Sequence, residues 1–144
     1  MKLSTKCRYG VRAMVEIAKN FRNGPVKRKD ISIVQDISSS YLENILITLK
    51  GSKLIRPTRG AKGGFVLETE PSQITLYRMV MALEGSIAPV ECLDNAAVCR
   101  KSPQCAVRKA WKKLYDAQTT TLKSITLQDL LDMENEKDEL AYSI

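Results

Sequence analysis

Apolar side chains recur every three or four residues in the first part of the chain, the spacing that lets a helix bury one face. This pattern predicts a helix over residues 5–22, which Asn23-Gly24-Pro25 ends. It also predicts a short second helix over residues 27–34, with Ile31 and Val34 facing the core. Both helices are therefore expected to pack against a common interior.

A third helix is predicted after a short polar segment. The apolar run from Tyr41 to Leu49 has helical spacing, and Ser38 or Ser39 stands where a helix cap is expected. Two short helices joined by a tight turn, the second beginning with small polar residues, are typical of the helix-turn-helix motif. In that motif the second helix enters the major groove of DNA.

A basic, glycine-rich hairpin is predicted directly after this motif. Residues 53–58 and 64–67 are expected to form two short strands, with residues 59–63 at the tip. A hairpin in this position is typical of a wing, whose Arg59 can enter the minor groove while the third helix lies in the major groove. The alternative interpretation is an ordinary surface hairpin.

The rest of the chain is predicted to be helical apart from one irregular segment. Helices are expected over residues 74–84, 104–124 and 127–135, and residues 86–103 lack a regular pattern. The acidic stretch 132–139 is expected to be solvated. The long helix carries Trp111, the one tryptophan of the chain, and has the length of a helix that packs against a second subunit as well as its own core. Packing against its own core alone is the alternative.

These elements predict a mainly α fold with a small β-wing, in which a winged helix-turn-helix head is joined to a long dimerisation helix. The predicted organisation has three parts. Residues 1–85 form the DNA-binding domain, residues 86–105 form a cysteine loop, and residues 104–144 form the dimerisation helix and a C-terminal helix.

The charge is concentrated in the head. The 144 residues include 23 Lys and Arg and 16 Asp and Glu, a net charge of +7. Residues 1–70 hold fourteen of the cations and six of the acids, a balance of +8, while residues 71–144 are close to neutral. Lys27, Arg28 and Lys29 begin the second helix, where cations oppose the helix dipole. A phosphate partner explains them better than helix stability does.

Composition also excludes several classes of function. The chain has no histidine, which rules out His-based acid–base catalysis and Ser-His triads, and no enzymatic activity is expected. We find no apolar run of membrane-spanning length and no signal-peptide pattern, so a cytoplasmic protein without a membrane partner or a small-molecule substrate is expected.

Three of the four cysteines are closely spaced, as Cys92-x6-Cys99-x5-Cys105. Thiolates bind soft or borderline metals, and a flexible loop can wrap them round one centre, although the spacing is not that of a zinc ribbon. The alternative, that these are buried hydrophobes, suits one cysteine better than three in a proline-containing loop. The isolated Cys7 is interpreted as a partly buried thiol, with a fourth ligand as the alternative.

These motifs together resemble the Rrf-two (Rrf2) family of winged helix-turn-helix transcriptional regulators, of the iron–sulfur cluster regulator (IscR) type. The resemblance covers essentially the whole chain, and its most specific motif is the Arg-Gly-x-x-Gly-Gly-aromatic sequence of the wing. The matching stretches are residues 1–10, 37–43, 59–65, 82–85, 88–92 and 126–130.

The resemblance implies a homodimer held by the long helix, which binds a double-stranded DNA operator and carries an iron–sulfur cluster, 2Fe–2S in preference to 4Fe–4S. It implies that Ser38, Ser40, Glu43 and Asn44 face bases or phosphates, that Glu43 discriminates between bases, and that Arg59 enters the minor groove. With the basic starts of the helices and the wing tip, the predicted DNA-binding residues are Lys27, Arg28, Ser38, Ser39, Ser40, Tyr41, Glu43, Asn44, Lys50, Arg59, Gly60 and Lys62.

The resemblance assigns Cys92, Cys99 and Cys105 as cluster ligands. Two positions depart from the family pattern. Arg108 stands where a histidine follows the last cysteine, and Cys7 stands where glycine is usual, so Cys7 is a candidate fourth ligand by position. Two other functions remain open: a cluster-free regulator of cysteine or sulfur metabolism that responds through its thiols or a partner protein, and a protein-interaction or metal-storage module.

Overall fold

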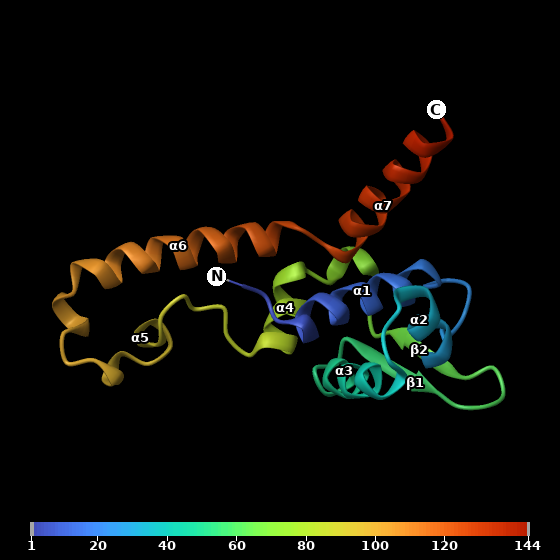
Figure 1. The fold of residues 1–144 in the computed structure, drawn as a ribbon, viewed down its shortest axis with the longest axis horizontal. Helices are drawn as coiled ribbons and strands as arrows, with labels where there is room; N and C mark the ends of the chain where they lie inside the picture. Colours follow the sequence, from blue (N-terminus) through green and yellow to red (C-terminus); the bar gives the residue numbers. More distant parts are fainter. Residues whose placement is uncertain (1, 144) are drawn as a thin grey trace.

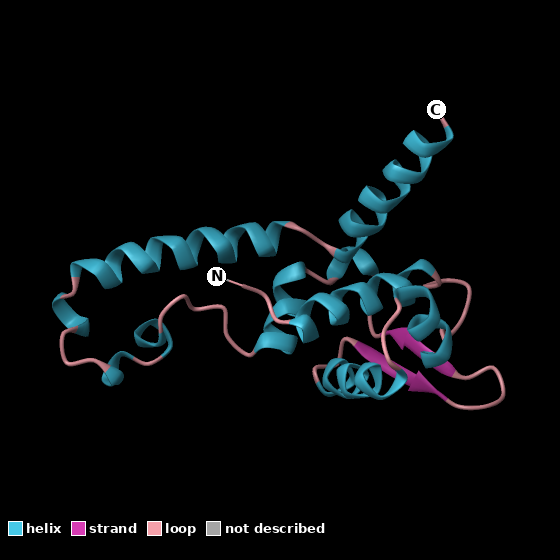
Figure 2. Cartoon of the chain, viewed as in Figure 1, coloured by secondary structure: helices cyan, strands magenta, loops and turns pink. Residues whose placement is uncertain are grey.

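The computed structural model describes residues 2–143 and is mainly helical, with one two-stranded antiparallel sheet (Figures 1 and 2). The helices are α1 (Thr5–Lys19), α2 (Arg28–Gln35), α3 (Ser39–Gly51), α4 (Leu76–Glu84), α5 (Glu91–Asp94), α6 (Ala106–Ser124) and α7 (Leu127–Tyr142), and the strands are β1 (Ile55–Thr58) and β2 (Gly64–Leu67). The predicted mainly α fold with a small wing is confirmed. Residues 1 and 144 of the predicted segments lie outside the described residues.

One hydrophobic core lies in the head, which we define as α1 to α4 with the two strands. Helices α1, α3 and α4 each direct one apolar face into it, and the strands close it on one side. The first residue of α7, Leu127, also enters this core. The largest fully buried side chains are Met14, Ile17, Ile31, Leu42, Ile45, Leu49, Leu54, Ile55, Ile74, Met79, Val80 and Leu127. The burial of these side chains fixes how the two helices of the helix-turn-helix cross.

Helix α2 contributes less to this core than the sequence predicts. Ile31 is 1% exposed, but Val34 is 63% exposed, so the inward placement of Val34 was wrong. The helix ends after Gln35, where Asp36 adopts the left-handed conformation with φ 51° and turns the chain towards α3. A helix this short presents only about one residue per turn to the core.

The wing is attached to the start of the helix-turn-helix by backbone hydrogen bonds. In β1 and β2, Pro57 pairs with Phe65 and Thr58 with Gly64. Phe65 also bonds to Val26 in both directions, with N···O distances of 3.0 and 2.9 Å. A Cβ on Gly64 would lie 2.5 Å from the carbonyl oxygen of Val26, so this close approach requires glycine.

Helix α7 is longer than predicted. It begins with a capping box, in which the Thr126 hydroxyl accepts from the Asp129 N–H at 3.1 Å and the Thr126 N–H donates to the Asp129 carboxylate at 2.7 Å. It continues to Tyr142 rather than ending at residue 135, because Glu, Lys, Leu and Ala are strong helix formers. The acidic stretch is therefore helical, and most of its side chains are exposed.

Helix α6 extends sideways from the head, and the short α5 lies beside its far end (Figure 1). Within the described chain, none of the 19 residues of α6 is buried, although Tyr115 and Leu122 are partly covered by the core. The segment 86–103, predicted to be irregular, contains α5 and two short 3-10 turns. In residues 2–143, every helix is too short or too polar to cross a bilayer.

Candidate DNA-binding face and cysteine loop

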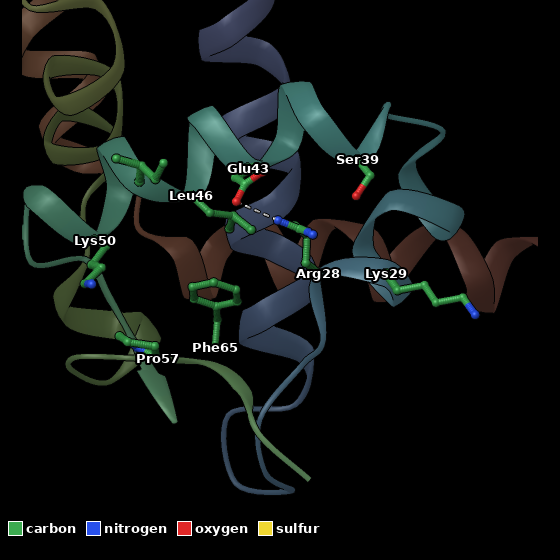
Figure 3. Close-up of a pocket in the computed structure, with 9 residues that line it drawn as sticks. Arg28, Lys29, Ser39, Glu43, Leu46, Lys50, Pro57 and Phe65 are labelled. Carbon is green, nitrogen blue, oxygen red and sulfur yellow. Dashed lines mark ion pairs between the residues drawn. The ribbon is translucent and has the colours of Figure 1, made fainter. Parts of the chain in front are cut away.

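A groove of about 610 Å³ opens between α3, the start of α2 and the two strands (Figure 3). Its lining combines cations with apolar side chains. The residues are Arg28, Lys29, Ser39, Glu43, Leu46, Ile47, Lys50, Pro57 and Phe65. The groove joins the helix-turn-helix to the wing on one continuous face, which we call the α2–α3–wing face.

Four of the twelve residues predicted to bind DNA line this groove: Arg28, Ser39, Glu43 and Lys50. Arg59, Gly60 and Lys62 lie at the wing tip, and the Tyr41 ring packs against Tyr9 of α1. All twelve are exposed or half-exposed, which contact with a duplex requires. Ser38 is the N-cap residue of α3, as predicted, and Lys27 is that of α2, but in the described structure neither side chain makes a capping hydrogen bond to its helix. The first N–H groups of both helices therefore remain available to an anion, as at many phosphate sites.

The wing tip has the backbone that its glycines predict. Gly60 has φ 107°, a left-handed conformation that side chains disfavour. At Gly63 a Cβ would lie 2.4 Å from the carbonyl oxygen of Thr58, so a turn this tight requires glycine there. This tight turn leaves Arg59 and Lys62 exposed at the end of the hairpin.

One ion pair crosses the face. The Arg28 guanidinium Nη1 lies 3.0 Å from Oε1 of Glu43, and the two side chains point towards each other across the groove (Figure 3). The side chains are 42% and 56% exposed, so water screens the pair. The pair links the first residue of α2 to the middle of α3.

A second chain of contacts supports the face from behind. Arg12 lies 5.2 Å from the centre of the Tyr9 ring, which meets the Tyr41 ring edge-on at 6.0 Å. Arg12 also donates to the side-chain and backbone oxygens of Gln35, both at 2.6 Å. Helix α1 thus holds both the end of α2 and the start of α3 in place.

The three closely spaced cysteines lie in separate parts of their loop. Cys92 is in α5, Cys99 is exposed after a 3-10 turn, and Cys105 is the N-cap of α6, where its Sγ accepts from the Arg108 N–H at 3.3 Å. Among the described residues, no three His, Cys, Asp or Glu side chains come together as a metal site. Thiolate sulfur suits iron chemically, but this arrangement of the loop does not fit a cluster.

A hydrogen bond from Arg108 holds the cysteine loop against α6. The Nε of Arg108 donates to the carbonyl oxygen of Cys92 at 3.1 Å, which joins α5 to the first turn of α6. Arg108, which the resemblance places where a histidine is usual, thus bonds to the backbone of one of the predicted ligands. A guanidinium cannot act as an ordinary metal ligand.

Cys7 lies apart from this loop, in the head core, and is 0% exposed. Burial raises the pKa of the Cys7 thiol to about 11, and the charge and hydrogen bonding of Glu84 add to the shift. The same carboxylate accepts from the Ser4 N–H at 2.6 Å. A buried thiol whose thiolate is this disfavoured supports the interpretation of Cys7 as a core residue.

Two residues of the groove did not emerge from the sequence as candidates. Pro57 and Phe65 line it from the strands, and they face each other across the hairpin. Counting outward from the tip at residues 59–63 pairs them, so the hairpin register could have identified them.

Comparison with known proteins identifies one family. The family model Rrf2, described as iron-dependent transcriptional regulator, matches residues 3–133. The HTH-type transcriptional regulator CymR of Bacillus subtilis (strain 168) is 38% identical over 139 residues, covering 96% of this chain and 96% of CymR.

Solved structures give the same result. The structure of CymR, the global cysteine regulator of B. subtilis, matches with a TM-score of 0.78 and 38% identity over 92% of this chain and 98% of CymR. The structure of T. potens IscR matches with a TM-score of 0.79 and 34% identity over 95% of this chain and 90% of IscR.

Proposed function

The chain belongs to the Rrf2 family of transcriptional regulators, and from this premise we propose that it binds double-stranded DNA through the α2–α3–wing face. The observation that carries the proposal is a groove in which cations of α2 and α3 (Arg28, Lys29 and Lys50) come together, with the strands of the wing as its other wall. In the proposed complex α3 enters the major groove and Arg59 enters the minor groove. The free N–H groups at the starts of α2 and α3 bind phosphates.

The proposal extends to a homodimer held by α6. Val107, Trp111 and Leu114 are 58%, 41% and 42% exposed and are spaced by four and three residues, so they form one apolar stripe. A second copy is the proposed occupant, because a heptad-like stripe on a projecting helix is suited to pairing with itself. The dimer then carries two heads, which suits an operator with two half-sites.

For the sensing function, the family description supports an iron–sulfur cluster on Cys92, Cys99 and Cys105, with 2Fe–2S as the preferred type. The cluster would supply a redox- and iron-sensitive centre. The thiol chemistry supports this form and the arrangement of the loop does not, so no regulatory step is derived through it.

The second candidate is a cluster-free regulator of cysteine or sulfur metabolism that responds through its thiols or through a partner protein. The bond from Arg108 to the Cys92 carbonyl favours it, because it holds the loop together without a metal. Similarity to a global cysteine regulator supports the same form. A protein-interaction or metal-storage module is the third possible outcome of the tests.

Two measurements test these proposals. In a salt titration of DNA binding, log K should fall by about 0.9 per phosphate contacted for each unit of log salt. Absence of binding at low salt would contradict the DNA proposal and favour the interaction module.

Anaerobic purification with visible absorption, iron and sulfide analysis distinguishes the two forms of the sensor. A coloured protein that loses its iron when Cys99→Ser is introduced supports the cluster. A colourless protein that cannot be reconstituted, but whose DNA affinity changes with peroxide only while these cysteines are present, supports the thiol form.

A further inference from the structure

The ion pair between Arg28 and Glu43 contributes little to folding, which points to another role. Arg28 is the first residue of α2, where a positive charge opposes the helix dipole. Both side chains are about half exposed, and ion pairs in such positions add little stability. Of the described residues that line the groove, Glu43 alone carries a negative charge.

A lone carboxylate on a DNA-binding face is unfavourable in one respect and selective in another. Glu43 repels phosphates, and it can only accept hydrogen bonds, so it tolerates the amino groups of cytosine or adenine and rejects the carbonyl edges of other bases. Pairing with Arg28 offsets the charge of Glu43 and holds Oε1 in place, with Oε2 left for a base. The other N–H groups of Arg28 remain able to reach a phosphate.

Resting on the DNA-binding function proposed above, we propose that Arg28 is a specificity-determining residue. It positions the Glu43 carboxylate and cancels its repulsion of phosphates, so that bases are selected by the pair rather than by Glu43 alone. Lys29 provides a matched comparison, because it is the next residue on the same helix, lines the same groove and is also cationic. A cation that only contacts phosphate should behave like Lys29.

The test begins with a pool of short duplexes with a randomised centre, from which the wild-type chain selects a binding sequence. Fluorescence anisotropy then gives the affinity for that duplex and for each of its single-base-pair variants. The proteins compared are the wild type, Arg28→Ala, Lys29→Ala, Glu43→Gln and the double variant Arg28→Ala/Glu43→Gln. Thermal unfolding of each variant should match the wild type, which separates binding from folding.

Arg28→Ala should weaken binding to the selected duplex by about tenfold and change which base pairs are preferred. Lys29→Ala should weaken binding to all duplexes equally. The fall of log K with log salt should become less steep by about 0.9. Glu43→Gln should reduce discrimination between base pairs and make log K fall more steeply with log salt, because the charge of Arg28 is no longer offset by Glu43. The double variant should bind better than Arg28→Ala alone, because the unpaired carboxylate is gone.

Two results would overturn the proposal. If Arg28→Ala and Lys29→Ala weaken all duplexes alike and the effects of Arg28→Ala and Glu43→Gln simply add, Arg28 is only a phosphate contact. If the wild type enriches no sequence and binds no duplex at low salt, the proposed function itself fails and the specificity role fails with it.

Discussion

The side-chain amide of Gln35 donates a 2.6 Å hydrogen bond to Oε1 of Glu16, and this bond fixes the end of α2 to α1. Glu16 is only 9% exposed, and Lys19 donates to the same oxygen at 2.9 Å. Gln35→Ala removes a partner from a nearly buried carboxylate, together with the side-chain oxygen that accepts from Arg12, and should lower the free energy of unfolding in urea by about 1–3 kcal/mol. Gln128→Ala is the matched control, because Gln128 bonds to Asp132 on an exposed helix surface. If both variants lose the same free energy of unfolding, the proposed role of this buried bond is contradicted.

The apolar stripe of α6 predicts a change in oligomeric state. Trp111→Asp places a charge in the centre of the proposed dimer interface and should convert the protein from dimer to monomer in sedimentation velocity experiments. Lys113→Asp is the control, because helical geometry puts residue 113 on the opposite side of α6. A dimeric Trp111→Asp variant, or a monomeric wild type, would show that α6 does not hold two copies together.

The close contact at Gly64 predicts a loss of stability. The Cβ of Gly64→Ala would press on the Val26 carbonyl and should cost about 1–3 kcal/mol, measured as a shift in the urea midpoint. Gly51→Ala is the comparison, because a Cβ at the end of α3 meets no atom within 4 Å. That change should be neutral or stabilise by up to about 1 kcal/mol. Equal stability of the two variants would mean that the wing does not pack on Val26 as described.

The capping box of α7 predicts a dependence of stability on pH. Hydrogen bonds from the backbone and side chain of Thr126 lower the pKa of Asp129 in the folded state. The stabilisation is therefore complete above the ordinary carboxyl pKa and is lost as the pH falls through the lowered value. The Asp129→Asn variant should have a lower melting temperature than the wild type at neutral pH, and the difference should shrink in acid. Thermal melts from pH 7 downwards measure this difference. Asp132→Asn lies outside the box and should keep the acid sensitivity of the wild type.

Burial predicts which cysteine resists alkylation. With iodoacetamide at pH 8, Cys99 should be modified in the native protein, while Cys7, whose pKa burial raises to about 11, should react only after denaturation. Mass spectrometry of native and urea-treated samples measures this difference. Modification of native Cys7 as fast as Cys99 would restore Cys7 as an accessible candidate ligand.

Local patterns predicted the helices other than α5, and the hairpin, because their evidence is contained in short windows of sequence. The repeat of apolar residues identified α1 and α3, and the glycines of residues 60–64 identified the hairpin. The exposure of Val34 did not follow from periodicity, because it depends on where Asp36 ends α2. Membership of the Rrf2 family, expected from the motifs, is confirmed.

Relationships between distant residues could not be predicted in the same way. The pairing of Arg28 with Glu43 depends on how α2 and α3 cross, which the packing of the core sets. The separation of Cys92, Cys99 and Cys105 depends on the conformation of a loop with little buried surface. Spacing in the sequence gives an upper limit on the distance between residues and does not bring them together.

The bonds between Val26 and Phe65 have a consequence for the DNA as well as for the protein. They fix the base of the wing to the residue that precedes Lys27. The wing, proposed for the minor groove, and the start of α2, proposed for phosphates beside the major groove, are therefore held at a fixed distance from each other. Two contacts held at a fixed distance cannot adapt to DNA grooves of different width. In the proposed complex, a duplex whose grooves do not match this distance would have to bend or narrow to meet both contacts. The ease with which a sequence deforms would then be part of what the protein recognises, even at base pairs that it never touches.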